Sequence, residues 1–219
     1  MATKASKVTT GNVQSSEIKF TKDDEIETVR PEELTETGKP KEQITFSYVA
    51  KFKKVSFDQF KKDLIDCGFN MNDAFIRSVY DAIKLPTRAT MGSAGYDFYS
   101  PIPFIISNMN VSPRGITVPT GIRCALNPFY FMMMVPRSGL GIKEYTRLGN
   151  SVGIIDRDYY FADNEGDIMI NIRSDVPGNP PVYVSAGQAI CQGIILPFGI
   201  ADGDDAKSER TGGLGSTDR

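Results

Sequence analysis

GIIDRDY, residues 153–159, places a carboxylate and an aromatic ring three residues apart, directly after an apolar run. A polar turn occupies residues 161–166, and an apolar run resumes at residues 168–170. This order predicts a strand, a turn and a second strand, with Asp156 at the mouth of the hairpin. Such a carboxylate can orient a water molecule, and the ring of Tyr159 can cover a flat or ring-shaped ligand. An Asp and a Tyr in a turn are usually structural when they stand alone, so a functional interpretation depends on the rest of the chain.

The segments around this stretch have the pattern of a mainly β domain. From residue 85 onward, short apolar runs alternate with Gly, Pro, Asn and Asp. Regularly spaced short strands with turn residues between them are typical of a sandwich or jelly roll. Strands are predicted at residues 96–99, 104–106, 115–118, 121–126, 129–135, 151–155, 166–172, 182–184 and 190–196.

The chain before residue 85 predicts a different organisation. Residues 1–43 are rich in Thr, Ser, Glu and Lys, and we expect a weakly ordered arm there. Ser56 is a predicted helix cap, and Pro86 ends the helical region. The predicted elements are a strand at 44–55, a helix at 57–65 and a short helix at 71–83. The expected parts are the arm at 1–43, a strand plus helical extension at 44–84, a β-barrel at 85–203 and a flexible C-terminal arm at 204–219.

Composition excludes several classes of function. A net charge of −2 and a pI of about 5.3 predict no direct binding of nucleic acid, because the chain lacks a basic footprint. No apolar stretch reaches the length of a membrane span, and the N-terminus lacks a signal-peptide core. The chain has no histidine, which excludes Ser-His-Asp and Cys-His catalysis and the common histidine zinc sites. Three widely spaced cysteines suit part-buried thiols in a reducing cytoplasm.

Four further segments stand in order around residues 153–159. They are AGYDF at 94–98, PRSGLG at 136–141, GQAICQGI at 187–194 and RTGGLGST at 210–217. Together the five segments resemble the five sequence motifs of the trimeric dUTPases, the dUTP nucleotidohydrolases. The resemblance covers about residues 83–219, and five motifs in series are far more specific than one. The long turn at 161–165 is similar to that of some bacterial and phage members.

The resemblance has consequences for fold, assembly and reaction. It implies a mainly β fold, a distorted jelly-roll barrel of the dUTPase kind, with a small helical insertion near the N-terminus. It implies a homotrimer with shared active sites that hydrolyses dUTP to dUMP and pyrophosphate, which limits uracil in DNA and supplies dUMP for dTMP synthesis. Mg²⁺ is the implied cofactor, held mainly by triphosphate oxygens and water, since Mg²⁺ commonly has few protein ligands.

Residues 136–141 follow a strongly apolar predicted strand and suit a phosphate-binding loop. Gly139 and Gly141 allow a sharp turn that points backbone N–H groups at one spot. Arg137 adds a planar, permanently charged fork, and Ser138 can donate a hydrogen bond. The alternative is a turn whose arginine forms a salt bridge. The resemblance favours phosphate binding and places Ser138 and Gly139 against the α- and β-phosphates.

Asp156 is the predicted catalytic residue. By resemblance it is the general base that orients a water molecule for attack on the α-phosphorus, and a phosphoryl-transfer site mainly supplies position and charge stabilisation. Asp158 is two residues further on, so in a strand both carboxylates would share a face and the sequence alone does not separate them. The family motif favours Asp156, whereas a turn carboxylate that caps backbone N–H groups accounts for Asp158.

The base and sugar of the substrate are expected beside this segment. By resemblance, Tyr159 lies flat against the deoxyribose and excludes a 2′-hydroxyl group, and Asn150 binds uracil through its side chain. A tight hairpin would exclude the thymine methyl group and mismatch cytosine, leaving buried polar groups unpaired. The backbone groups expected to complete this edge are those of Gly153, Ile154, Ile155 and Met169. The alternative for Asn150 is an ordinary turn residue.

Two other motif residues have both a functional and a structural interpretation. The resemblance places Asp97 near the phosphates, where it would bind the metal through water. A structural role for Asp97, such as pairing with Arg137, is at least as well supported by the sequence. Gln192 would hydrogen-bond a phosphate, and the alternative is a core-facing polar residue at a strand end.

The C-terminal motif is expected to fold over the phosphates of the bound nucleotide. The residues that would do so are Arg210, Leu214, Gly215, Ser216 and Thr217. Leu214 stands where the family usually has a Phe that stacks on uracil, so weaker substrate binding is predicted. A Gly-rich tail is otherwise simply a flexible terminus.

Two other functions stay open on the sequence alone. A dCTP deaminase shares the fold, but enzymes of that kind use a Glu in the base pocket and lack the Asp156–Tyr159 pair. A dUTP-responsive regulatory protein is the second alternative, with the N-terminal extension as the surface for a protein partner.

Overall fold

The computed structural model describes residues 48–178, 180–206 and 212, so the predicted N-terminal arm and the first part of the strand predicted at 44–55 lie outside the described residues. Residues 49–206 lie within one compact unit. The strands are β1 (Ala50–Lys54), β2 (Thr87–Arg88), β3 (Gly95–Tyr99), β4 (Phe104–Ile106), β5 (Ile116–Pro119), β6 (Ile122–Leu126), β7 (Tyr130–Pro136), β8 (Thr146–Leu148), β9 (Gly153–Ile155), β10 (Met169–Ser174), β11 (Val182–Val184) and β12 (Ala189–Pro197). The helices are α1 (Phe57–Asp66) and α2 (Asp73–Ala82), with a π-helical turn at Gly139–Lys143 and a 3-10 helix at Arg157–Phe161.

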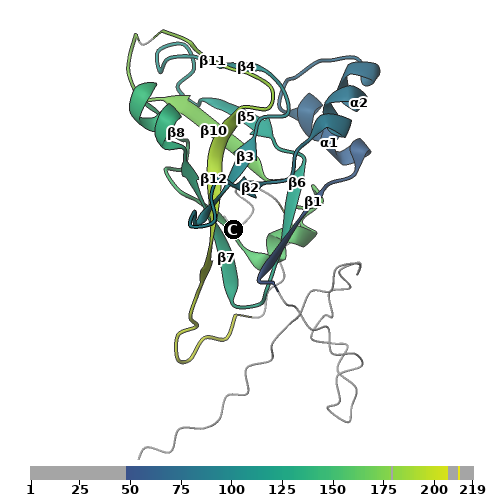
Figure 1. Cartoon of the computed structure of the whole chain (residues 1–219), viewed down its shortest axis with the longest axis vertical. Helices are drawn as coiled ribbons and strands as arrows, with labels where there is room; N and C mark the ends of the chain where they lie inside the picture. Colours follow the sequence, from purple (N-terminus) through teal and green to yellow (C-terminus); the bar gives the residue numbers. More distant parts are fainter. Residues whose placement is uncertain (1–47, 179, 207–211, 213–219) are drawn as a thin grey trace, which may run out of the picture. The chain divides into compact units, whose positions relative to one another are not determined.

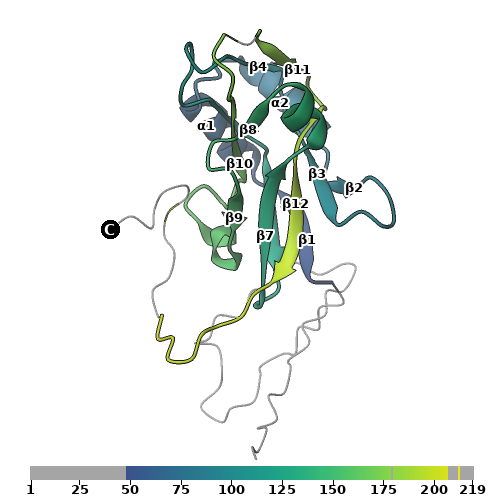
Figure 2. The same ribbon diagram turned by 90° about the vertical axis from the view of Figure 1, so that its left-hand side faces the viewer.

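The described strands pair antiparallel in four small sheets. The largest has the order β2-β3-β12-β7-β9, and a second has the order β5-β10-β8. The remaining pairs are β1 with β6 and β4 with β11. Figures 1 and 2 show β7 and β12 running side by side as the longest strands, with the smaller sheets packed around them. The fold is the mainly β, distorted jelly roll that the sequence predicts.

The core forms where these sheets face one another. Along β7 the side chains alternate, so that Met132 and Met134 are buried while Phe131 and Met133 are half-exposed. This alternation follows from the two-residue period of a strand. Phe98 on β3 and Ile190 on β12 are also fully buried. The largest sheet therefore has one face in the core and one apolar face that stays partly open.

The helical extension packs onto the barrel and shares its core. Ser56 caps α1, since its side chain accepts a hydrogen bond from Gln59 N at 3.1 Å, and Asn72 caps α2 in the same way. Phe60 and Leu64 on α1 and Ile76 on α2 are fully buried in the same cluster as Val118. Figure 1 shows the two helices together on one side of the sheets. Val55 N also donates to Gly121 O at 3.0 Å, which joins the extension to the strands.

The predicted elements agree with the structure except in a few places. The helices begin and end within two residues of the prediction, and β1 begins at Ala50, because Tyr48 and Val49 form a bend. β2 and β8 were not predicted. The predicted hairpin at residues 153–172 is wrong, because β9 pairs with β7, whereas β10 pairs with β5 and β8.

Candidate active site

The ends of β3, β7 and β12 bring three predicted phosphate-site residues together. Gln192 on β12 lies opposite Asp97 on β3 and opposite Val135 on β7. Arg137 follows β7, and its Nη1 donates to Asp97 Oδ2 at 2.8 Å. The Asp97 side chain is 11% exposed and that of Arg137 is 39% exposed. The structural pairing of Asp97 with Arg137 is therefore present, and the arginine still has an exposed part for a ligand.

Gly95 leaves room for the side chain of Gln192. A Cβ atom at Gly95 would lie 2.3 Å from Gln192 Oε1, which is closer than any real contact of this kind. The amide of Gln192 therefore lies across the backbone of the first motif. The Gln192 side chain therefore has space beside the backbone of Gly95, on the strand that carries Asp97.

The loop after β7 offers a donor and open space beside Arg137. Ser138 and Gly139 are exposed, and a Cβ atom at Gly139 would meet nothing within 4 Å. The loop continues into the π-helical turn, a geometry that is frequent at functional sites. Gly141 differs from the sequence prediction, because its N–H group donates to Arg137 O at 2.8 Å and is not available to a phosphate.

A pocket of about 230 Å³ lies at the seam between the two larger sheets. It brings together the residues that the sequence predicts around the base: Asn150, Gly153, Ile154, Ile155 and Met169. Whole-ligand pockets usually measure about 300–1,000 Å³. The smaller volume here suits a single base better than a complete nucleotide.

The same pocket includes residues that sequence reasoning missed. Its wall is completed by Met134, Leu148, Gly149, Ile170 and Asn171. A Cβ atom at Gly149 would lie 2.1 Å from Asn171 Oδ1, so Asn171 occupies the place of a side chain there. Asn171 Nδ2 donates to Thr117 Oγ1 at 2.9 Å, which holds the amide in position. The pairing of β8 with β10 creates this wall, and no local motif signals it.

Asp156 and Asp158 lie on a 3-10 helix and not on a strand. Asp156 is the residue before this helix, in extended conformation, and Asp158 lies in its first turn. Both side chains are exposed. The two carboxylates therefore do not share one face of a strand, as they would if both lay on a strand. Asp156 lies in extended backbone, whereas Asp158 lies in helical backbone. Asp156 directly follows Ile155, which lines the pocket, so it stands at the edge of the predicted base site.

Tyr159 is nearly completely buried, with 4% of its surface exposed. Its Oη donates to Asp167 O at 2.8 Å, and Asn164 Nδ2 lies 3.3 Å from the same hydroxyl group. The ring is therefore rigidly held. Its contact with a deoxyribose stays a prediction, and such a contact would use the small exposed part of the ring.

The long third-motif turn is anchored to the helical extension and to β6. Glu165 accepts hydrogen bonds from Ser56 N at 2.8 Å and from Ser56 Oγ at 2.7 Å. Arg123 on β6 donates to Tyr160 O at 2.6 Å, and its guanidinium lies 3.7 Å from the Tyr160 ring centroid. The extra residues thus hold the turn in place.

The three cysteines are free thiols. Burial raises the pKa of Cys67 to about 11, and it raises the pKa values of Cys124 and Cys191 further. The thiols are therefore protonated at neutral pH, and thiolate chemistry has no part in the site.

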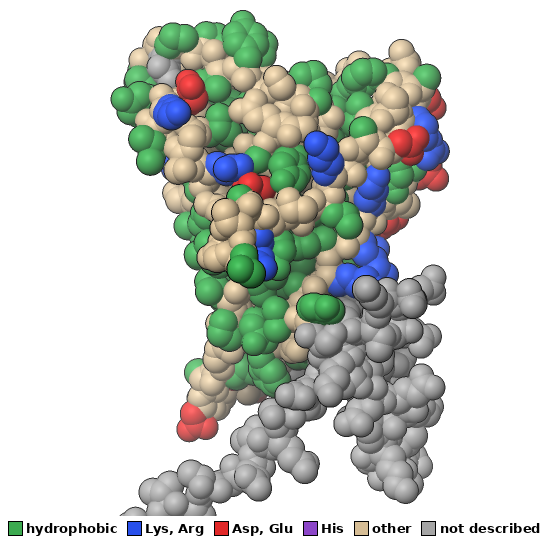
Figure 3. Space-filling model, in the orientation of Figure 1, with side chains coloured by type: hydrophobic (Ala, Val, Ile, Leu, Met, Phe, Trp, Pro, Cys, Tyr) green, Lys and Arg blue, Asp and Glu red, His purple; other side chains and the backbone are tan. Residues whose placement is uncertain are grey.

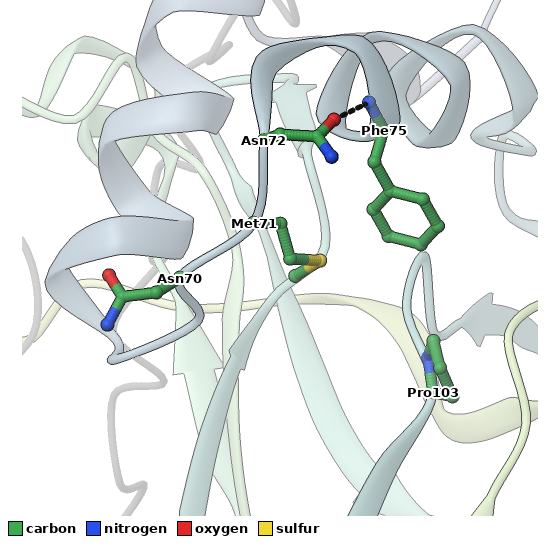
Figure 4. A pocket seen from close by; sticks show the side chains of 5 residues that line it. All are labelled: Asn70, Met71, Asn72, Phe75 and Pro103. Carbon is green, nitrogen blue, oxygen red and sulfur yellow. Dashed lines mark hydrogen bonds between the residues drawn. The ribbon is translucent and has the colours of Figure 1, made fainter.

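Figure 4 shows a second hollow, of about 440 Å³, on the helical extension. Its lining consists of Asn70, Met71, Asn72, Phe75 and Pro103. Asn72 Oδ1 accepts a hydrogen bond from Phe75 N at 2.8 Å, so this amide is used as a helix cap. None of the lining residues belongs to the five motifs, and the hollow is separate from the base pocket.

The described residues contain no group of three or more acidic, cysteine or histidine side chains that could hold a metal ion. Asp97 is the one carboxylate that the phosphate cluster supplies, and it is paired with Arg137. The predicted C-terminal contacts, Arg210, Leu214, Gly215, Ser216 and Thr217, lie outside the described residues. No helix in the described chain is long and apolar enough to cross a membrane.

Known proteins share both the sequence and the fold. A sequence model of the dUTPase family matches residues 81–217, well over half of the chain. A deoxyuridine 5′-triphosphate nucleotidohydrolase of Lactococcus lactis subsp. lactis is 37% identical over 139 residues, which is 62% of this chain and 88% of that protein. The matched residues 81–217 span the five motif segments.

One solved structure illustrates the similarity in fold, and a second has a lower TM-score. A mutant dUTPase of Staphylococcus bacteriophage 80alpha, with dUpNHpp, has a TM-score of 0.50 and 16% identity over 75% of this chain and 92% of that one. A mutant dUTPase of phage phi11 of S. aureus, whose structure concerns the coordination of a structural Mg(II) ion, has a TM-score of 0.48 and 15% identity over 74% and 98% of the two chains. From the family match and the curated relative, this chain belongs to the dUTPase family.

Proposed function

We propose that the chain is a dUTP diphosphatase, which hydrolyses dUTP to dUMP and pyrophosphate. The observation that carries the proposal is the base pocket. There Asn150, residues 153–155 and Met169 meet around a space of about 230 Å³, and Asp156 stands at its edge. The relatives named dUTP nucleotidohydrolases support the same activity.

Uracil would enter the base pocket through its hydrogen-bonding edge. Asn150 offers an amide, and residues 153–155 and 169 offer backbone N–H and C=O groups. A methyl group on the base would collide with the pocket wall, and the amino group of cytosine would replace an acceptor with a donor. A site built around specific hydrogen bonds rejects a base that leaves its buried polar groups unpaired.

The phosphates would lie along the cluster at the ends of β3, β7 and β12. Arg137, Ser138 and Gln192 supply donors there, and Gly139 leaves room for close approach. Arg210, Ser216 and Thr217 are proposed to cover the β- and γ-phosphates, with Gly215 allowing the backbone to come near and Leu214 covering the base.

Asp156 is the proposed general base. Its carboxylate would orient a water molecule and accept its proton while the water oxygen attacks the α-phosphorus. The bond from the α-phosphorus to the bridging oxygen breaks, and pyrophosphate leaves with the electron pair. Positioning and charge stabilisation supply most of the acceleration in such reactions. Tyr159 is proposed to limit the space at the sugar, so that a 2′-hydroxyl group does not fit.

Mg²⁺ is the proposed cofactor. The donor set fits an ion that arrives with the nucleotide, because one carboxylate, Asp97, is near the proposed phosphate site and Mg²⁺ commonly keeps water and phosphate ligands. Asp97 would hold it through water. When bound, the ion neutralises charge on the phosphate oxygens.

The assembly proposed is a homotrimer with shared active sites. Its support is the outer face of the largest sheet, where Phe131 and Met133 on β7 lie opposite Leu196 and Ile194 on β12. All four side chains are only partly buried. Figure 3 shows hydrophobic side chains gathered over the part of the surface where Figure 1 places β7 and β12. Contiguous exposed apolar surface of this kind marks interaction sites.

Three expectations from the sequence stay predictions. A cytoplasmic location rests on the free cysteines, and a protein partner for the extension rests on its extra length. The division of the chain at residues 43, 84 and 203 is likewise a prediction. The family membership leaves the dCTP deaminase alternative without support.

The decisive experiment measures pyrophosphate release from dUTP, dTTP, dCTP and UTP in the presence of Mg²⁺. Rapid release from dUTP alone is expected for the wild-type protein. Asp156→Asn should lower kcat by about 10²–10⁴-fold, the usual contribution of a positioned general base. Asp158→Asn is the matched control, since it removes a carboxylate two residues away and should keep most of the activity. Ammonia release from dCTP, or no turnover of dUTP by the folded wild type, would contradict the proposal.

A further inference from the structure

Two carboxyl groups meet in the interior where the helical extension joins the barrel. Asp63 lies on α1 and is 3% exposed, and Asp167 lies just before β10 and is 0% exposed. The two carboxyl groups act on each other's pKa, so they face one another across the junction. Gln59 Nε2 donates to Asp63 Oδ1 at 2.9 Å, and Gly121 N donates to Asp167 Oδ1 at 2.9 Å. Each carboxyl group is thus held by a donor from its own side of the junction.

One proton must lie between these two groups. Asp63 Oδ2 and Asp167 Oδ2 are buried, and neither has a hydrogen-bond donor among the described residues. Two carboxyl groups that share a buried site cannot both be ionised, so one of them is an acid that donates to the other. Burial raises the pKa of Asp167 well above its usual value, and the charge of Asp63 raises it further. The pair therefore holds one proton.

The other ionisable groups around the pair affect its pKa values less than burial does. Burial is also the main cause of the raised pKa of Asp63, to which nearby Asp66 contributes and which Lys62 opposes. Cys67, at the end of α1, stays a neutral thiol because its pKa is raised to about 11, partly by the two carboxyl groups. From the β5–β6 connection, Thr120 Oγ1 approaches Asp167 Oδ1 at 3.4 Å.

Asp167 also anchors the turn that carries the proposed catalytic segment. Its carbonyl oxygen accepts a hydrogen bond from Tyr159 Oη at 2.8 Å and one from Asn164 Nδ2 at 3.0 Å. The position of the Tyr159 hydroxyl group therefore depends on the backbone of Asp167. With a proton shared between Asp63 and Asp167, a chain of two hydrogen bonds would run from α1 through Asp167 to Tyr159.

We propose that Asp63 is a positioning residue for dUTP hydrolysis, which holds Tyr159 on the sugar side of the site through its hydrogen bond to Asp167. This inference rests on the proposed function. Asp63 acts only through Asp167, because it lies on α1, behind the third-motif turn. The helical extension, which precedes all five motifs, thereby takes part in the choice between deoxyribose and ribose.

Because the two carboxyl groups share a proton, the positioning of Tyr159 should weaken in one direction of pH only, as pH rises. A carboxyl group whose pKa is raised by folding stabilises the fold below the pKa of an unfolded Asp, and this stabilisation is lost as pH rises through the raised pKa. Above that pH both groups are charged and repel each other. Discrimination against UTP should therefore fall on the alkaline side. Asp167→Asn replaces the acid proton with a permanent N–H donor, so it should not show this fall.

The test is the ratio of kcat/KM for dUTP to kcat/KM for UTP, measured from neutral to alkaline pH. Asp63→Ala is expected to lower this ratio about tenfold at neutral pH, since a misplacement of roughly 1 Å can cost up to about 100-fold. Asp167→Asn should keep the wild-type ratio and keep it further into alkaline pH. Asp66→Asn is the matched control at neutral pH, because it removes an exposed carboxylate from the same helix and should leave the ratio there unchanged.

An unchanged ratio in folded Asp63→Ala would overturn the proposal, as would an alkaline fall of equal size in wild type and Asp167→Asn. Should Asp63→Ala fail to fold, Gln59→Ala is the second variant, because it removes only the half-buried amide that orients Asp63. A ratio in Gln59→Ala equal to that of the wild type would then overturn the proposal. Failure of the proposed function is separate, since the wild type would release no pyrophosphate from dUTP. In that event the ratio of the Kd values for dUTP and UTP gives the same comparison.

Discussion

At the scale of single residues, Arg137 is the position where a structural and a functional role meet. Its Nη1 is paired with Asp97 at 2.8 Å, and more than a third of its side chain is exposed. A lysine at this position would keep a positive charge beside Asp97 but would lose the planar fork that matches phosphate oxygens. The two roles therefore predict different results for one conservative substitution.

Arg137→Lys is expected to raise KM for dUTP by roughly 10- to 100-fold, because a hydrogen bond to a charged group contributes about 1.5–3 kcal/mol. Steady-state kinetics with dUTP and Mg²⁺ provide the measurement. Thermal unfolding is the control, since a fold held only by the charge pair should be equally stable with lysine. A wild-type KM would mean that Arg137 serves the ion pair alone.

Leu214→Phe is expected to lower KM for dUTP by about two- to tenfold. The reason is that an aromatic ring adds stacking on the uracil, worth about 0.5–1.5 kcal/mol beyond its buried area. Leu214→Ile is the matched control, because it keeps an aliphatic side chain of the same size. Equal KM values for Leu214→Phe and the wild type would show that the residue does not cover the base.

At the scale of elements, the base pocket depends on the pairing of β10 with β8 and on the contact of Gly149 with Asn171. These strands bring residues from two distant segments to one wall, and the amide of Asn171 fills the space above Gly149. The shape of the pocket is thus a property of the pair of strands.

Gly149→Ala should raise KM for dUTP and lower the free energy of unfolding by about 1–3 kcal/mol, the usual cost of overpacking. A Cβ atom at 2.1 Å would displace Asn171 and break its 2.9 Å hydrogen bond to Thr117. Calorimetry and kinetics together test this. Gly199→Ala is the control, because a Cβ atom there meets nothing within 4 Å. Equal effects of the two substitutions would contradict the role of the Gly149–Asn171 contact.

The elements also show what sequence alone predicts. Helix α1 was predicted to within one residue because Ser56 provides a local cap signal and Phe60 and Leu64 the helical spacing. The partner of β9 was not predictable in this way, since strand pairing is decided by contacts distant in the sequence. β2 has two residues, both exposed, so it has no apolar pattern to detect. The motif residues 97, 137 and 192 were found, whereas Asn171 and the Asp63–Asp167 pair carry no local signal.

At the scale of the whole molecule, the outer face of β7 and β12 predicts the oligomeric state. Met133→Lys would place a charge in the middle of the proposed interface, opposite Ile194. We expect the trimer to dissociate at micromolar concentration and dUTP turnover to fall with it, because the proposed sites are shared between subunits. Sedimentation velocity gives the mass of the assembly.

Val111→Lys is the control for this substitution, since it also places a lysine on an exposed apolar residue, one that is 72% exposed. It should leave both mass and activity unchanged. A Met133→Lys protein that stays trimeric would show that the interface lies elsewhere, and a fully active monomer would contradict shared sites.

The bond from Ser56 to Glu165 also has a consequence for how the protein is made. The two residues are 109 positions apart in the chain. At a synthesis rate of about 5–20 residues per second, Ser56 is synthesised roughly 5–20 seconds before Glu165, which binds the N-terminus of this helix. The extension is thus translated before the barrel and is among the last parts to be secured. During that interval the apolar side of α1 is open to chaperones, and a pause in translation before residue 165 would lengthen the exposure.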